Sequence, residues 1–120
     1  MTRYQVWYRA AMWPVEYLEA AARERGKLPA SERAAIFNAV EKLKNLGPDL
    51  PFPHASDVRG APRLRELRPR RGRCQWRALY VRDGGRFIIA AIAPDGDSDR
   101  RGFAMSCERA LQRLAEREEG

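Results

Sequence analysis

Two apolar segments joined by a tight turn constrain this fold more than any other feature of the sequence. The segments 74–81, CQWRALYV, and 86–93, RFIIAAIA, flank an Asp83-Gly84 pair that is typical of a short β-hairpin. The segment 63–67, RLREL, comes before them across the turn PRRGR and is expected to be a further strand. The sequence therefore predicts an antiparallel meander of three strands.

The N-terminal half predicts one strand and two helices. The aromatic and β-branched run YQVWY at 4–8 predicts a first strand. Trp13-Pro14 is expected to start a helix, because proline suits the first helical position, and Gly26 is expected to end it. Ser31 is a suitable N-cap for a second helix that runs to about Leu46. The apolar stripe of that second helix is expected to be Ile36, Ala39, Val40 and Leu43.

The expected order β-α-α-β-β-β-α indicates an α+β fold in one domain, residues 1–120. We expect a small, mainly antiparallel sheet with an antiparallel helical hairpin on one face, which leaves the other face partly open. After a loop at 94–103, a C-terminal helix at about 105–117 is expected to turn four side chains inward, those of Cys107, Ala110, Leu111 and Leu114.

The period of the 74–81 strand assigns its side chains to two faces. Cys74, Trp76, Ala78 and Tyr80 share one face, and Gln75, Arg77, Leu79 and Val81 share the other. Trp76 and Tyr80 are expected to pack against the helical hairpin. Arg77 is expected to face water, a carboxylate or a phosphate, because an unpaired guanidinium is costly to bury.

Positive charge is concentrated in one segment of the chain. The formal net charge is +7, and residues 59–86 carry ten arginines against Glu66 and Asp83. Codon bias accounts for arginine in place of lysine, but it leaves the shortage of acidic residues in this segment unexplained. Such a concentration favours contact with a polyanion such as nucleic acid, with a solvated face or an acidic protein partner as the alternatives.

Several classes of protein are not expected from this sequence. No apolar run approaches the ~20 residues of a membrane span, and the N-terminus lacks a signal-peptide pattern, so we expect a cytoplasmic protein without membrane contact. Cys74 and Cys107 lack metal-binding spacing and are expected to be buried thiols. His54, the single histidine, is expected to be an exposed or capping loop residue. We expect neither a metal nor a cofactor.

The order of LRELR, a glycine-containing turn, QWRALYV, GGRFIIAAIA and ERALQRL resembles the RelE/HigB toxin superfamily, and it is closest to the phage-derived, HigB-like branch. The similarity is best over 36–92. The resemblance implies a toxin of a type II toxin–antitoxin pair, which enters the ribosome and cleaves mRNA as an mRNA interferase. It also implies a cognate antitoxin partner, expected to be a helix-turn-helix protein.

The resemblance also implies candidate catalytic residues. Arg77 matches the arginine of the family's Y-R-x-x-Y strand, and Arg68 matches the arginine that closes the L-x-E-L-R strand. Glu66 is the acidic residue of that strand, and it either acts as a general base or pairs with one of these arginines. The family's lysines after the third strand are absent here, where the sequence reads AIAPDGDSDRR, and the helix tyrosine falls near Cys107.

Arginine is also suited to binding RNA phosphates. Its forked donors match the geometry of a phosphate, and the side chain keeps its charge near neutral pH. The candidate RNA-binding residues are Arg65, Arg70, Arg71, Arg73, Arg100 and Arg101. Two alternative functions stay open at this point. One is a toxin-fold protein that binds RNA or an antitoxin-like partner without cleavage, and the other is a relative that poisons DNA gyrase.

Overall fold

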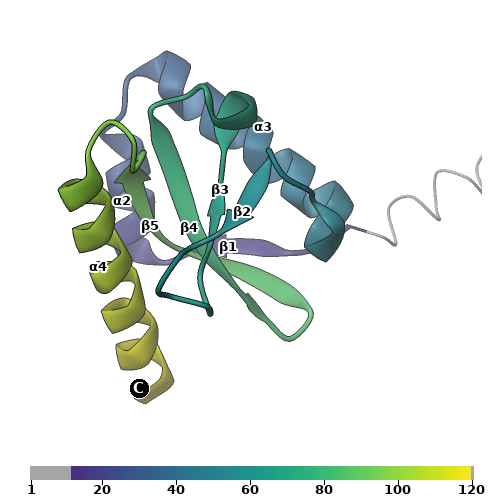
Figure 1. Cartoon of the computed structure of the whole chain (residues 1–120). Coiled ribbons are helices and arrows are strands. Elements are labelled where there is room, and N and C mark those ends of the chain that lie inside the picture. The colour runs from purple at the N-terminus through teal and green to yellow at the C-terminus, as the bar shows by residue number, and fades with distance from the viewer. Residues whose placement is uncertain (1–11, 120) are drawn as a thin grey trace, which may run out of the picture.

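A computed structural model describes residues 12–119, so the strand expected at 4–8 lies outside the described residues. Five strands form one sheet in the order β1-β5-β4-β3-β2 (Figure 1). The strands are β1 (Val15–Tyr17), β2 (Ala55–Asp57), β3 (Arg65–Leu67), β4 (Trp76–Asp83) and β5 (Arg86–Pro94). Only the β1–β5 pair is parallel among these strands. The predicted α+β class is confirmed.

The predicted meander is confirmed as β3–β4–β5. Asp83 and Arg86 face each other at the end of the β4–β5 hairpin, and Gly84 between them has a φ of +63°, which glycine adopts without strain. The extension of the sheet by β2, which pairs with β3, was not predicted. At three residues, this edge strand is too short to show a periodic pattern.

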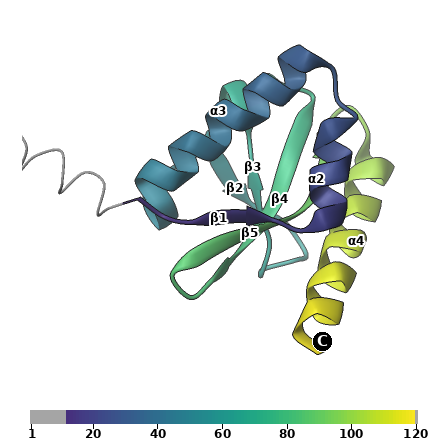
Figure 2. The ribbon, with the colours of Figure 1, turned by 180° about the vertical axis from the view of Figure 1, so that it is seen from behind.

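The prediction that Trp13-Pro14 starts a helix is wrong. Val15–Tyr17 instead forms β1, which pairs in parallel with Phe87–Ile89 of β5 and covers the free edge of that strand. The helix begins later, as α2 (Glu19–Gly26), and ends at the predicted glycine. Figure 2 shows β1 as the link that carries the chain across the sheet into α2.

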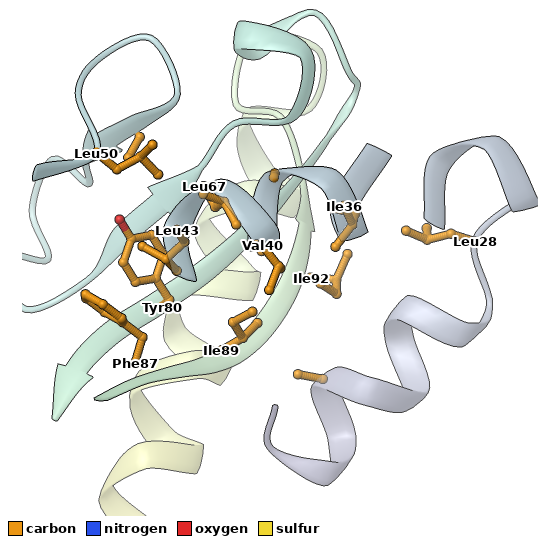
Figure 3. Packing of buried hydrophobic residues seen from close by; sticks show 14 residues of the cluster. Leu28, Ile36, Val40, Leu43, Leu50, Leu67, Tyr80, Phe87, Ile89 and Ile92 are labelled. Atoms are coloured by element: carbon orange, nitrogen blue, oxygen red, sulfur yellow. The ribbon is translucent and has the colours of Figure 1, made fainter. Parts of the chain in front are cut away.

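The helix α3 (Ala30–Leu46) covers one face of the sheet with the predicted stripe. Ile36, Ala39, Val40 and Leu43 are all buried. Figure 3 shows Leu43 beside Tyr80, Val40 directed at Ile89 and Ile36 beside Ile92, and Tyr80 belongs to this core as predicted. Trp76 packs against the same cluster.

Two details of the helical pair differ from expectation. The α3 N-cap is Pro29 rather than Ser31, because the backbone N–H groups of Glu32 and Arg33 both donate to the Pro29 carbonyl. Figure 2 shows α2 and α3 diverging from their short connection, so they do not form the antiparallel hairpin that was expected. Each helix packs on the sheet instead.

The second face of the sheet is covered, which corrects the expectation of a partly open face. The helix α4 (Arg100–Glu119) begins earlier than predicted and lies along β5 (Figure 1). Cys107, Ala110 and Leu114 are buried there against β4 and β5. Leu111 was expected to point inward, but 37% of it is exposed, because it lies on the solvent side of the helix.

A half-buried carboxylate connects α4 to the rest of the fold. Glu24 of α2 accepts two hydrogen bonds from Arg113 of α4, at 3.1 and 2.8 Å, and one from the backbone N–H of Ile92 at 3.1 Å. Burial alone raises the pKa of Glu24, but these bonds and the charge of Arg109 hold it below its usual value. Within residues 12–119, no helix has the length and apolarity to cross a bilayer.

Candidate functional site

Three charged residues, one each from β3 and β4 and one directly after β3, meet at one end of the sheet. Glu66 of β3 accepts hydrogen bonds on its Oε1 atom from Arg68 Nη1 at 3.0 Å and from Arg77 Nε at 3.1 Å. The sheet register brings them together, because Glu66 lies opposite Leu79, two residues along β4 from Arg77. The sequence-predicted catalytic residues therefore converge, with Glu66 between two guanidinium groups.

Arg77 lies deeper than expected. Only 4% of its side chain is exposed, and of the expected partners of its guanidinium, water, a carboxylate or a phosphate, the structure provides a carboxylate, that of Glu66. Besides Glu66, its guanidinium donates to the carbonyl oxygens of Gly72, Cys74 and Trp76. These acceptors hold the turn between β3 and β4 against the sheet, and they explain how a charged group is tolerated in the core.

Glu66 and Arg68 are more accessible than Arg77. Their side chains are 13% and 22% exposed, and Glu66 Oε2 forms no hydrogen bond within residues 12–119. Arg68 Nε donates to the Pro53 carbonyl at 3.1 Å, and its guanidinium lies over the Phe52 ring at 5.4 Å. One carboxylate oxygen and one anchored arginine are thus available at the rim of the buried Arg77.

The turn η2 (Pro69–Gly72) presents arginines in an unusual backbone conformation. Arg70 and Arg71 have φ values of 54° and 57°, a left-handed region that costs a side-chain-bearing residue about 1–2 kcal/mol. Gly72 follows at 88°, and a Cβ there would collide with Arg68 Nη2. Strain of this kind persists where the surrounding structure enforces it, here through the bonds from Arg77 to the carbonyl oxygens of Gly72 and Cys74.

Five of the six predicted RNA-binding arginines are exposed: Arg70, Arg71, Arg73, Arg100 and Arg101. Three belong to or follow η2, and two begin α4, after the loop that leaves β5 beside the start of β4 (Figure 1). Cations in the first turn of a helix oppose its dipole, and α4 has no acidic residue in that turn. Asp99 offsets part of this cost by accepting from Gly102 N at 2.8 Å, as an N-cap does.

Arg65 does not join the other arginines. Neighbouring residues of a strand point to opposite faces, so Arg65 turns away from Glu66. It pairs with Asp57 and donates weakly to the Tyr80 hydroxyl at 3.4 Å. Through these contacts Arg65 connects β3 to β2 and β4, and it does not take part in the Glu66 cluster.

Asp95 is a buried residue of this region that the sequence did not single out. It follows β5 and accepts from Ser98 N at 2.9 Å and from Ser98 Oγ at 2.8 Å. Burial alone raises the pKa of Asp95, but the Ser98 bonds and the charge of Arg77 hold it below its usual range. Its three-residue spacing to the Ser98 N–H is that of an N-cap, which is a signal that could have located it.

The two thiols and the histidine have defined surroundings. Cys74 and Cys107 are buried and free, as predicted. Cys74 Sγ donates to Glu32 Oε2 at 2.9 Å, and burial followed by this bond raises the pKa of Cys74. His54 is half-buried beside α3 rather than fully exposed. Within residues 12–119, no three His, Cys, Asp or Glu side chains gather in a way that could hold a metal ion.

Comparison with known families decides the relationship. Residues 23–95, more than half of the chain, match the family described as Phage derived protein Gp49-like (DUF891). This chain belongs to the Gp49-like family. The resemblance to the phage-derived branch is thereby confirmed, over nearly the segment where the sequence resembles it best.

Two solved structures of toxins resemble this Gp49-like chain. The toxin–antitoxin complex RelBE2 from Mycobacterium tuberculosis matches with a TM-score of 0.56 at 21% identity, covering 72% of this chain and 95% of the other. A mutant of the E. coli toxin RelE in the free state matches with a TM-score of 0.58 at 13% identity, covering 82% and 97%. At these identities the similarity shows a RelE-like fold. No curated protein sequence matches.

Proposed function

We propose that this Gp49-like protein is the toxin of a type II toxin–antitoxin pair, and that it inhibits translation by cleaving mRNA on the ribosome. The observation that carries the proposal is the meeting of Glu66 with Arg68 and Arg77 at the end of a RelE-like sheet that is ringed by exposed arginines. A carboxylate and a fixed cation at one point are two of the groups that RNA cleavage by a 2′-hydroxyl needs.

Each residue of this cluster has a distinct proposed role. Glu66 accepts the proton of the attacking 2′-hydroxyl through its free Oε2. Arg68 stabilises the charge that develops on the phosphorus oxygens, and Arg77 is a positioning residue that fixes Glu66 from below. The products are a 2′,3′-cyclic phosphate and a 5′-hydroxyl, whose proton is supplied by water.

The exposed arginines supply affinity without sequence choice. Arg70, Arg71, Arg73, Arg100 and Arg101 contact phosphates of the mRNA or of ribosomal RNA, because guanidinium groups bind phosphate oxygens in a forked geometry. Arg65, which is paired with Asp57, adds positive charge further along β3. A cognate antitoxin is the proposed protein partner, in keeping with the complex in which the M. tuberculosis toxin was solved.

A second function is favoured by one specific observation. Asp95 is buried where the family resemblance leads us to expect basic residues, and Arg77 is enclosed by backbone carbonyls. A site with fewer free cations favours a protein of this fold that binds RNA or an antitoxin-like partner and leaves the RNA intact.

The experiment that separates these functions is induced expression followed by mapping of mRNA ends on translating ribosomes. Cleavage predicts growth arrest and new 5′-hydroxyl ends within coding regions. Arg68→Ala and Glu66→Gln are each expected to lower the cleavage rate by about 10²–10³, the cost of losing one group at a charged transition state. Arg59→Ala, which removes an exposed arginine elsewhere, is the control.

Two outcomes contradict the proposal. If a folded Glu66→Gln/Arg68→Ala variant cleaves mRNA at an unchanged rate, Glu66 and Arg68 do not form the cleavage site. If the protein binds ribosomes in a salt-sensitive way and no new mRNA ends form, the cleavage reaction is contradicted and the non-cleaving function is supported.

A further inference from the structure

A pocket of 210 Å³ lies between α3, the chain that leads into β2 and the chain that leaves β3. Five polar side chains line it: Asn38, Lys42, His54, Arg68 and Arg70. Leu50 and Leu67, both buried, form part of its floor. Its location is on the α3 side of β3, whereas Glu66 faces the α4 side, so Arg68 is the residue that the pocket shares with the proposed cleavage site.

The lining of this pocket is positively charged. Lys42 forms no ion pair among residues 12–119, and no carboxylate belongs to the lining. The nearest acid that compensates Arg70 is Glu32, whose Oε2 lies 3.8 Å from Nη1, a weak contact for a charged pair. Lys42 and Arg70 therefore hold positive charge at a concave site without a close partner.

The positive charge around the pocket also acts on the imidazole of His54. Desolvation is the first cause that lowers the pKa of His54, and the positive charges of Lys42 and Arg71 lower it further. A bound anion would oppose both charges.

An aromatic surface adjoins the mouth of the pocket. Phe52 is 71% exposed, and it is held between Pro51 and Pro53 in the chain that leads to His54. Arg68, which lines the pocket, lies over one side of the Phe52 ring at 5.4 Å. An exposed ring supported by a guanidinium is a suitable platform for stacking an unpaired base.

We propose that this pocket is a nucleotide subsite, which binds one unpaired nucleotide of RNA with its phosphate against Lys42 and Arg70 and its base on Phe52. The identification of the nucleic acid as RNA rests on the proposed function. A volume of 210 Å³ is smaller than the roughly 300–1,000 Å³ of sites that enclose drug-sized ligands, so the pocket holds the sugar-phosphate and leaves the base outside, where Phe52 stands.

The combination of groups favours RNA over an acidic protein segment. A segment of aspartate or glutamate would use the cations, but it would leave the exposed Phe52 ring without a partner. A nucleotide uses both, because its phosphate pairs with the cations and its base stacks on the ring. Such a subsite would hold a nucleotide beside the one that is cleaved, since Arg68 contacts both regions.

The single histidine allows a direct test in the full-length protein. NMR spectra of the imidazole of His54 are recorded during titrations with 5′-AMP, adenosine and inorganic phosphate. We expect 5′-AMP to shift the His54 signals to saturation, adenosine to leave them unchanged, and phosphate to bind about tenfold more weakly than 5′-AMP because it lacks the stacked base. Saturating 5′-AMP should also raise the His54 pKa, since the dianion opposes Lys42, Arg68, Arg70 and Arg71 in a site where Glu32 is the nearby carboxylate.

Matched variants separate the two halves of the subsite. Lys42→Ala is expected to weaken 5′-AMP binding about tenfold, as loss of one charge-assisted contact does, while Lys27→Ala leaves it unchanged. In the Phe52→Leu variant, the affinity for 5′-AMP is expected to fall to the affinity for inorganic phosphate. Phe37→Leu changes another exposed phenylalanine and is expected to leave the affinity for 5′-AMP unchanged. All four side chains are exposed, so these variants keep the fold.

Three results would overturn the inference. The first is that 5′-AMP leaves the His54 signals unchanged, and the second is that the Lys42→Ala variant binds 5′-AMP as tightly as the unchanged protein does. The third is that a glutamate-rich peptide shifts the His54 signals at a lower concentration than 5′-AMP does, which would assign the pocket to a protein partner. The titration involves neither ribosomes nor cleavage, so a failure of the proposed cleavage reaction and a failure of the subsite give different results.

Discussion

At the scale of single residues, burial separates the three predicted catalytic side chains. Arg77 fixes both a carboxylate and the turn that follows β3, so its main contribution is to stability. Replacement by alanine leaves Glu66 with one partner and removes a donor from three backbone carbonyls, and breaking a buried pair costs about 3 kcal/mol or more. We therefore expect Arg77→Ala to lower the free energy of unfolding by about 3 kcal/mol in urea denaturation.

The matched control for this prediction is Arg73→Ala, which removes an exposed arginine from the same turn. Its effect is expected to stay within about 0.5 kcal/mol, as for most surface changes. A loss below about 1 kcal/mol in the Arg77→Ala variant would contradict the structural role. Any reduction of toxicity by that variant has to be compared with its folded fraction before a catalytic meaning is assigned.

The carboxylate of Asp95 adds a pH dependence at this scale. Its pKa is lower in the folded protein than in the unfolded chain, so its contribution to stability is present above the unfolded pKa and is lost as the pH falls through the folded pKa. Asp95→Asn is expected to unfold at a lower urea concentration than the wild type at pH 7, and the gap should narrow below about pH 4.

Urea midpoints measured across this pH range test the expectation. Asp97→Asn changes an exposed carboxylate of the same loop and is expected to leave the midpoint profile unchanged. A gap between Asp95→Asn and the wild type that stays constant with pH would show that the Asp95 side chain acts through packing rather than through its charge.

At the scale of elements, the η2 turn offers a pair of substitutions with opposite effects. Arg71 has a left-handed backbone, and Arg73 has a φ of −85°. Glycine at position 71 relieves a strain of about 1–2 kcal/mol against an entropic cost of about 0.5–1 kcal/mol. Arg71→Gly should therefore stabilise the protein by about 0.5–1 kcal/mol, whereas Arg73→Gly should destabilise it by a similar amount.

Thermal or urea unfolding of the two variants measures this difference, since both remove one exposed positive charge. If both variants change stability in the same direction, charge rather than backbone strain controls the turn. If the stabilised Arg71→Gly variant also binds RNA less tightly, the strained backbone serves to present that arginine.

The elements also show what the sequence could predict. The meander, the stripe of α3 and the face occupied by Tyr80 followed from local periodicity and from the Asp83-Gly84 turn. The strand β1 did not, because Val15, Leu18 and Ala22 also fit a helical period, and only pairing with the edge of β5 decides between the two. Periodicity of the local sequence carries no information about such a long-range pair.

The site shows the same limit. The sequence placed Arg77 on the correct face of β4, but it gave no sign of the carbonyls that enclose the guanidinium, because these come from the path of the turn. The early start of α4 at Arg100 had a similar cause: the Asp99 cap is recognisable only once the loop at 94–99 is seen to be short.

At the scale of the whole molecule, free positive charge gathers at the end of the sheet that carries η2 and the start of α4 (Figure 1). If this end binds the RNA backbone, the affinity falls as salt rises, because each neutralised phosphate releases counterions. For single-stranded RNA, the slope of log K against log salt changes by about 0.7 for each contact.

Removing two arginines from this end tests that surface directly. Arg71→Ala/Arg101→Ala is expected to make the slope shallower by about 1.4, measured with a 2′-O-methyl RNA that resists cleavage. The control, Arg23→Ala/Arg59→Ala, lowers the net charge by the same two units at exposed positions on α2 and at the opposite end of β3. If the two double variants have equal slopes, the RNA affinity depends on net charge alone. The end of the sheet would then not be the RNA-binding surface.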